Sequence, residues 1–334
     1  MTLSPEEALE RAAEAGIHRL RIPTPFAVGR VNCYLLEDEP LTLIDTGPNS
    51  GKALDELQAQ LAAHGHSIDD IGLVILTHQH IDHLGLIEIV VGHSGAEVAA
   101  LGLAAERLGN FGEDAEREDE FAVELMLRNG IPSEVAFALQ SVSRSFRGWG
   151  SRAEVTRPLA DGEEVVFRDR TLRTLHRPGH SPSDTVFWDE ERRILIAADH
   201  LIAHISSNPL ITRPLDGSAE RTQALVTYIE SLRQTREMPA EIVLSGHGEP
   251  IVDHVALIDD RLAKHERRKE KIYGLIQEAP RSGYEIAQAI WGNVAVTQAF
   301  LTLSEVIGHA DLLVNEGRVR EADDGEVIRY ETTR

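Results

Sequence analysis

The stretch LTHQHIDHLG (residues 76–85) decides the fold of this chain, because it places three histidines and one aspartate within six positions. It follows an apolar run that is typical of a buried strand. In an extended segment residues i and i+2 project to one side, so His78 and His80 can bind one metal ion together. Where the chain turns into a helix, Asp82 and His83 can reach a second, neighbouring ion. Imidazole and carboxylate groups are donors that divalent transition metals prefer.

Further candidate ligands stand where other predicted strands end. They have small or glycine neighbours, which let the backbone and a ligand approach closely. These residues are His180, Asp199 and His247, after predicted strands at 171–175, 194–197 and 241–244. Any one of them could be an ordinary polar residue. Four ligand-bearing strand ends in a single chain make coincidence a poor explanation.

Composition restricts the class of protein. The 334 residues carry a formal net charge of −22, and such a surface repels the phosphates of nucleic acids. The single cysteine, Cys33, lies in an apolar segment and predicts a buried thiol in a reducing compartment. Ser4 and Pro5 predict a capped helix at the N-terminus instead of a signal peptide. No apolar run is long enough to span a bilayer. We therefore expect a cytoplasmic protein without membrane contact.

The order of predicted elements favours an α/β fold. Short strands are expected at 18–22, 30–36, 41–44, 71–76, 164–167, 171–175, 184–188, 194–197 and 241–244, with helices after Ser50 and over 218–236. Residues 103 to about 150 interrupt this rhythm with charged helical segments. We interpret residues 1–254 as one layered domain that carries this helical insertion.

The pattern changes from residue 255 onward. A long charged helix is expected to continue to Gln277, followed by a short helix after Ser282 and a helix from about Val296 to Val314. A hairpin with Asp324-Gly325 as its turn ends the chain. Helix, short helix, helix and a two-stranded wing predict a winged-helix-like domain over residues 255–334.

These motifs resemble those of the metallo-β-lactamase-fold hydrolases, in particular the branch that contains glyoxalase II and related thioesterases. The resemblance runs from about Leu20 to Pro250. It rests on the 78–83 cluster, on Asp45 in the segment LIDTG, and on the three histidine and aspartate positions at later strand ends: His180, Asp199 and His247. The resemblance implies an αββα four-layer sandwich with metals at one edge, between the two sheets.

The resemblance also implies the role of each site residue. His78, His80 and His180 would hold a first metal ion, Asp82, His83 and His247 a second one, and Asp199 would bridge both. Asp45 would orient a ligand histidine by accepting its other N–H. Two divalent ions are expected, with zinc favoured by the mixed donors and manganese or iron as alternatives.

Two cations that share one water would supply a bridging hydroxide as the nucleophile and polarise a substrate carbonyl. Asp82 or Asp199 could deliver a proton to the leaving group. The expected reaction is hydrolysis of a small-molecule ester or thioester, acyl-CoA included. The basic run 267–271 could hold a coenzyme A phosphate, although a solvated helix face is the favoured interpretation.

Other functions are kept as alternatives: a metal-dependent phosphodiesterase or nuclease, a lactonase of the same superfamily, or a binding module without activity. Many metal-dependent lactonases of this superfamily have a tyrosine shortly after the bridging aspartate. No tyrosine follows Asp199 closely here, so lactonase activity is disfavoured. Residues 262–334 contain 10 basic and 12 acidic residues, and the predicted recognition helix has no lysine or arginine. Nucleic acid is therefore an unfavoured partner. We expect the C-terminal domain to serve packing or formation of a homodimer.

Overall fold

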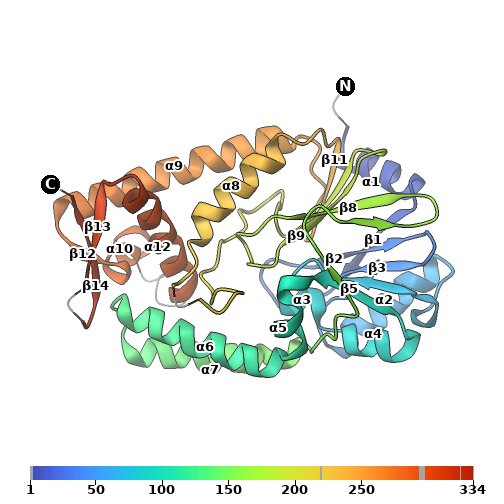
Figure 1. The fold of residues 1–334 in the computed structure, drawn as a ribbon, viewed down its shortest axis with the longest axis horizontal. Helices are drawn as coiled ribbons and strands as arrows, with labels where there is room; N and C mark the ends of the chain where they lie inside the picture. The colour runs from blue at the N-terminus through green and yellow to red at the C-terminus, as the bar shows by residue number, and fades with distance from the viewer. Residues whose placement is uncertain (1–2, 219, 293–297, 324, 334) are drawn as a thin grey trace.

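The computed structural model describes residues 3–218, 220–292, 298–323 and 325–333. Two large sheets lie at one end of the molecule and a small sheet with its helices lies at the other (Figure 1). The long helix α9 runs along one side between the two ends, and the helices α6 and α7 run along the opposite side. Among the described helices, none is both long and apolar enough to cross a lipid bilayer.

The first sheet contains six strands in the order of the chain. Its first three strands are antiparallel and the remaining pairs are parallel. The strands are β1 (Ile17–Ile22), β2 (Val31–Leu36), β3 (Thr42–Ile44), β4 (Leu73–Ile75), β5 (Glu97–Leu101) and β6 (Arg157–Leu159). The expected strand at 71–76 is therefore shorter than its apolar run, because Ile71 and Leu76 are buried without belonging to the ladder.

The second sheet contains five strands in the order β11-β10-β9-β8-β7. Only its β10–β11 pair is parallel. The strands are β7 (Glu164–Val166), β8 (Thr171–His176), β9 (Thr185–Asp189), β10 (Ile194–Ala198) and β11 (Ile242–Ser245). All five agree with the sequence prediction to within one or two residues.

Alternating side chains bury both faces of each sheet. In β2, Cys33 and Leu35 pack against the outer helices of the first sheet, while Tyr34 and Leu36 pack between the sheets. The outer helices are α2 (Gly51–Ala63) and α4 (Ile87–Ser94) on the first sheet, and α8 (Ala224–Arg236) and α9 (His254–Glu278) on the second. The αββα four-layer sandwich is thereby confirmed. The N-terminal helix α1 (Pro5–Glu14) is capped by Ser4 as predicted.

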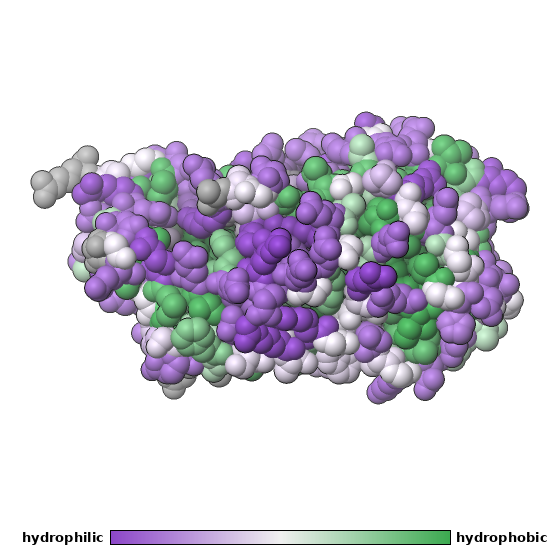
Figure 2. Space-filling model, turned by 60° about the horizontal axis from the view of Figure 1, so that its bottom comes forward, coloured by the Kyte–Doolittle hydropathy of each residue, from purple (hydrophilic) through white to green (hydrophobic). Residues whose placement is uncertain are grey.

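The helical insertion leaves the first sheet after β5 and returns to it at β6, which pairs with β5. It consists of α5 (Ala105–Gly109), α6 (Phe111–Arg128) and α7 (Ser133–Phe146), with short 3₁₀ turns at Gly102–Ala104 and Arg147–Trp149. Figure 2 shows the side of the molecule that carries these helices, with hydrophilic side chains gathered over its middle. The insertion is thus an addition to the sheet that leaves its ladder intact.

The C-terminal segment continues from α9 into α10 (Gly283–Trp291), α12 (Ala299–Asn315) and a sheet in the order β12-β14-β13. The strands are β12 (Arg281–Ser282), β13 (Val319–Asp323) and β14 (Ile328–Thr332). The helices and hairpin agree with the sequence prediction, whereas Val296 and Asp324 lie outside the described residues. Classification as a winged helix, and the domain boundary at 254/255, stay predictions.

One core joins the insertion to the C-terminal helices. Residues of α6 and α7 pack with Ile211, with the start of α8 and with one face of α12. Arg221 holds the same helix α12 through two hydrogen bonds of 2.7 and 2.6 Å to Asp311. The helix expected over 218–236 begins only at Ala224, because the preceding segment crosses this junction as irregular chain.

Two of the leucines of α12 allow this shared core to be tested. Leu303 is completely buried in it, whereas Leu301 is 39% exposed. We expect Leu303→Ala to lower the free energy of unfolding by about 2–5 kcal/mol, because the substitution leaves a cavity. Leu301→Ala, the matched control, should cost less than about 1 kcal/mol. Urea unfolding followed by circular dichroism measures both, and equal losses would contradict the shared core.

Candidate functional site

The predicted site residues come together where strands of both sheets end. β4 leads through Thr77 into the short helix α3 (Ile81–Leu84), and this segment carries the four donors of the 78–83 cluster. The second sheet contributes the other three: His180 follows β8, Asp199 follows β10 and His247 follows β11. The seven side chains form two groups, each with donor atoms within 4.8 Å of one another.

Three imidazole nitrogens converge in the first group. Nδ1 of His80 lies 3.0 Å from Nε2 of His78 and 2.9 Å from Nε2 of His180. Two ligand atoms that each lie about 2.0–2.1 Å from one tetrahedral zinc ion are roughly 3.3 Å apart, so the spacing of these nitrogens is close to that of zinc ligands. Asp199 completes this group, with its Oδ2 3.5 Å from Nε2 of His180.

The outer nitrogens of His78 and His180 are occupied. Thr77 donates its hydroxyl proton to Asp45, so its Oγ1 accepts from Nδ1 of His78 at 2.9 Å. Nδ1 of His180 donates to the carbonyl of Asn208 at 3.2 Å. In a neutral ring the proton on Nδ1 leaves Nε2 as a bare acceptor. His80 could place one proton on its Nδ1, but a single proton cannot satisfy the lone pairs on Nε2 of both His78 and His180. A cation between the three rings would satisfy them all.

The second group consists of Asp82, His83 and His247, all buried. Nε2 of His247 lies 3.3 Å from Oδ2 of Asp82, and its Nδ1 donates to the carbonyl of Arg30 at 3.0 Å. Within the described residues, Nε2 of both histidines lacks a hydrogen-bond partner. Buried polar nitrogens without hydrogen-bond partners are costly, so this set of side chains also fits a metal ion.

Asp199 lies between the two groups. Its Oδ2 is 3.5 Å from Nε2 of His180 and of His247, and its Oδ1 is 3.5 Å from Nε2 of His83. Gly246 makes this approach possible, since a Cβ atom there would lie 2.2 Å from Oδ1 of Asp199. The carboxylate is thus placed to face two cations at once.

Asp45 supports the cluster from behind. It adopts a left-handed backbone conformation, with φ of 58°, at the end of β3. Its carboxylate accepts from the backbone N–H and the hydroxyl of Thr77 at 2.9 and 2.8 Å, and lies 2.8 Å from Nδ1 of His83. One acid therefore orients His83 directly and His78 through Thr77.

Burial and charge act in opposite directions across the site. Burial and the neighbouring His83 lower the pKa of His78 well below its usual value, and burial and His180 lower that of His80 to about 3. Burial alone would also lower the pKa of His247, but Asp199 raises it to about 9. The carboxylates Asp199 and Asp45 likewise raise the pKa of His83. The second group thus attracts positive charge strongly.

Some supporting residues were not predicted. Thr77 immediately precedes the histidine motif, and a hydroxyl group at that position could have suggested a role. The carbonyl groups of Arg30 and Asn208 carry no side-chain signal, so sequence patterns could not find them. His200 and His204 lie close to Asp199 in the sequence, but neither belongs to the donor groups of the described residues.

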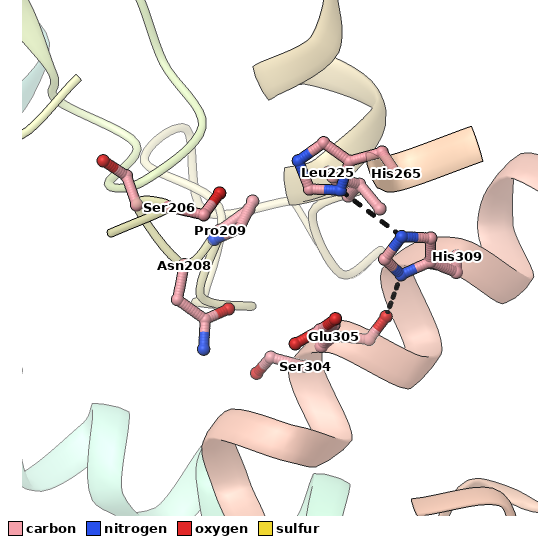
Figure 3. A pocket seen from close by; sticks show the side chains of 9 residues that line it. Ser206, Asn208, Pro209, Leu225, His265, Ser304, Glu305 and His309 are labelled. Carbon is pink, nitrogen blue, oxygen red and sulfur yellow. Dashed lines mark hydrogen bonds between the residues drawn. The ribbon is translucent and has the colours of Figure 1, made fainter. Parts of the chain in front are cut away.

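A cavity of about 130 Å³ is lined in part by Asn208, whose carbonyl accepts from His180 (Figure 3). It is lined by Ser206, Ser207, Asn208, Pro209, Leu225, His265, Ser304, Glu305 and His309. His309 donates from Nδ1 to the carbonyl of Glu305 at 2.6 Å, and its Nε2 lies 3.4 Å from Nδ1 of His265. Burial lowers the pKa of His265 to about 4 and that of His309 to about 3, so both rings are neutral at pH 7.

This chain of neutral rings leaves Nε2 of His265 as an acceptor. Within the described residues, neither this nitrogen nor Oδ1 of Asn208 has a hydrogen-bond partner, although both are buried. The cavity therefore suits a group that donates hydrogen bonds.

Comparison with known proteins places these observations in a family. The family model described as the metallo-beta-lactamase superfamily matches residues 27–247. The chain is 33% identical over 319 residues to the probable metallo-hydrolase YqjP of Bacillus subtilis, covering 94% of this chain and 97% of that protein.

A solved structure extends the likeness to the whole chain. The metallo-beta-lactamase family protein TTHA1429 of Thermus thermophilus superposes with a TM-score of 0.81 at 27% identity, over 95% of this chain and 99% of that one. A more distant relative is an atrochrysone carboxyl ACP thioesterase of Cryptosporiopsis, 22% identical over 96% of this chain and 79% of its own length.

The close approach of Gly246 to Asp199 generates a prediction. We expect Gly246→Ala to displace the carboxylate and lower the free energy of unfolding by about 1–3 kcal/mol, because a methyl group cannot fit there. Gly92→Ala in the exposed face of α4 meets no atom within 4 Å and should be neutral or stabilising by up to about 1 kcal/mol. Thermal unfolding measures both, and a Gly246→Ala protein as stable as the parent would refute the packing argument.

Proposed function

The chain belongs to the metallo-β-lactamase superfamily, and from this premise we propose that it is a hydrolase that uses two divalent metal ions to cleave an ester or thioester. One observation carries the proposal: the inward-facing nitrogens of His78, His80 and His180 converge, and hydrogen bonds among the three rings cannot satisfy all of them. A structural or binding module without activity would not require seven such donors at a partly accessible strand edge.

Each donor group would hold one ion. We assign His78, His80 and His180 to the first, Asp82, His83 and His247 to the second, and Asp199 to both, with zinc as the expected metal. When bound, two such cations lower the pKa of a shared water and polarise a substrate carbonyl. The chain's own part is to fix the rings through Asp45, Thr77 and the carbonyls behind them.

A carboxylate at the reacting centre could carry a proton to the leaving group, and Asp82 and Asp199 are the candidates. Burial by itself would raise the pKa of Asp199, but the imidazoles of His247 and His83 keep it well below its usual range. Asp82 is ionised for a similar reason, because His247 opposes the effect of burial on its pKa. Either carboxylate can therefore accept a proton during attack and return it to the leaving group.

The charge of the chain and one relative support the proposed substrate class. A net charge of −22 disfavours nucleic acids, whose binding depends mainly on basic side chains that neutralise phosphates. The printed name of the Cryptosporiopsis relative describes a thioesterase, which supports a thioester for this chain. We assign the cavity lined by His265 and Asn208 to a part of the substrate that donates hydrogen bonds, such as an amide or a hydroxyl.

A substrate panel tests the reaction. Zinc-reconstituted and manganese-reconstituted protein should hydrolyse members of a set of acyl-CoA thioesters and simple esters, and should leave lactones and a phosphodiester largely intact. His80→Ala is the blank, and Asp199→Ala should reduce turnover by at least about 1,000-fold, because it removes the side chain that faces both ions. Cleavage of the phosphodiester alone would refute the proposal, as would full activity of Asp199→Ala.

The role of Asp45 can be tested separately. Asn tolerates the left-handed backbone at this position but cannot accept hydrogen bonds on both side-chain atoms. We expect Asp45→Asn to weaken metal affinity by about 10–100-fold while leaving the fold intact. Competition with a chelator measures affinity, and circular dichroism checks the fold. Unchanged metal affinity would show that this acid does not orient the ligands.

A further inference from the structure

His18, His64, His66 and Glu37 lie close together on the surface at the end of α2. None of them belongs to the seven donors described above. Donor atoms of His18, Glu37 and His64 lie within 4.8 Å of one another. Nε2 of His18 is 2.9 Å from Oε2 of Glu37, and Nε2 of His66 is 3.6 Å from its Oε1.

The backbone fixes these four side chains. His18 lies on β1, paired with Leu35 of β2, and Glu37 follows β2 with its N–H bonded to the carbonyl of Gly16 at 2.9 Å.

The helix end fixes the other two histidines. The N–H of Gly65, whose φ is 81°, bonds to the carbonyl of Ala62, and the N–H of His66 bonds to that of Leu61, both at 3.0 Å. This pair of bonds is a Schellman motif, which ends a helix in one defined conformation. Ligands on such a scaffold lose little freedom when they bind an ion.

The side chains also have suitable chemistry. The rings of His18 and His64 lie with centroids 4.2 Å apart, so protonation of both would bring like charges together. The pKa of His64 lies below its usual value because burial and the neighbouring His18 disfavour its charged form. The pKa of Glu37 is also lowered, since His18 and His66 outweigh the effect of burial. Neutral imidazole and ionised carboxylate are the forms that bind metals.

We propose that His18, Glu37, His64 and His66 form a second, peripheral metal site that binds a zinc ion and fastens the end of α2 to β1 and β2. Three imidazoles and one carboxylate are a normal tetrahedral zinc set. None of these four residues belongs to the two donor groups around Asp199, and we assign the peripheral site to stability. The proposal does not depend on the reaction proposed above.

Zinc titration of tag-free protein followed by native mass spectrometry tests the site. The parent chain should bind one zinc ion per chain more than the variants His64→Ala and Glu37→Gln under the same conditions. His93→Ala is the matched control, since His93 is an exposed histidine whose nearest carboxylate, Asp69, is 3.8 Å away. It should bind as many ions as the parent.

Thermal unfolding provides the second measurement. The additional ion should raise the Tm of the parent and of His93→Ala but not that of Glu37→Gln, and turnover should be equal in all three. Equal zinc stoichiometry in the parent, His64→Ala and Glu37→Gln would overturn the proposal. Additional zinc that binds without any rise in Tm would overturn the assigned stabilising role.

Discussion

The site depends on a set of inward-facing histidine nitrogens whose hydrogen-bonding needs cannot all be met by one another. Nε2 of His78 and of His180 face the same nitrogen of His80, and only one of them could receive a proton from it. Such an arrangement persists only if each ring is held from outside. The hydrogen bonds to Thr77 and to the carbonyl of Asn208 do this, and they leave the lone pairs available for cations.

The αββα sandwich supplies the rigidity that these outer contacts need. The first sheet provides the segment after β4, and the second sheet provides the ends of β8, β10 and β11. Distances across the site therefore depend on the core between the sheets, where side chains such as Ile44, Ile75 and Ile196 are completely or almost completely buried. Close packing of this core resists the small sliding movements that would separate the donor groups.

The sequence was most informative where a pattern is local. The spacing of His78 to His83 and the strand ends at His180, Asp199 and His247 predicted residues that the structure brings together, because strand ends in a layered fold converge at one edge. Contacts through backbone carbonyls leave no pattern, so the partners of His180 and His247 were missed. The histidines that follow α2 were also missed, because His18 and His64 approach each other only through packing of α2 on β1. Helix α8 likewise begins later than predicted, because the residues before it make tertiary contacts with α12 that override their local helix preference.

One loop connects the C-terminal helices and the cavity beside them to the metal donors. Asn208 holds His180 with its carbonyl, while its side chain lines the cavity that α9 and α12 help to enclose. Helix α12 packs in turn on the insertion through Leu303 and its neighbours. A substrate group bound in the cavity would therefore contact the same loop that orients a ligand of the first ion. Because the loop is shared, changes in the insertion or the C-terminal helices can alter substrate choice without replacing any of the seven donors.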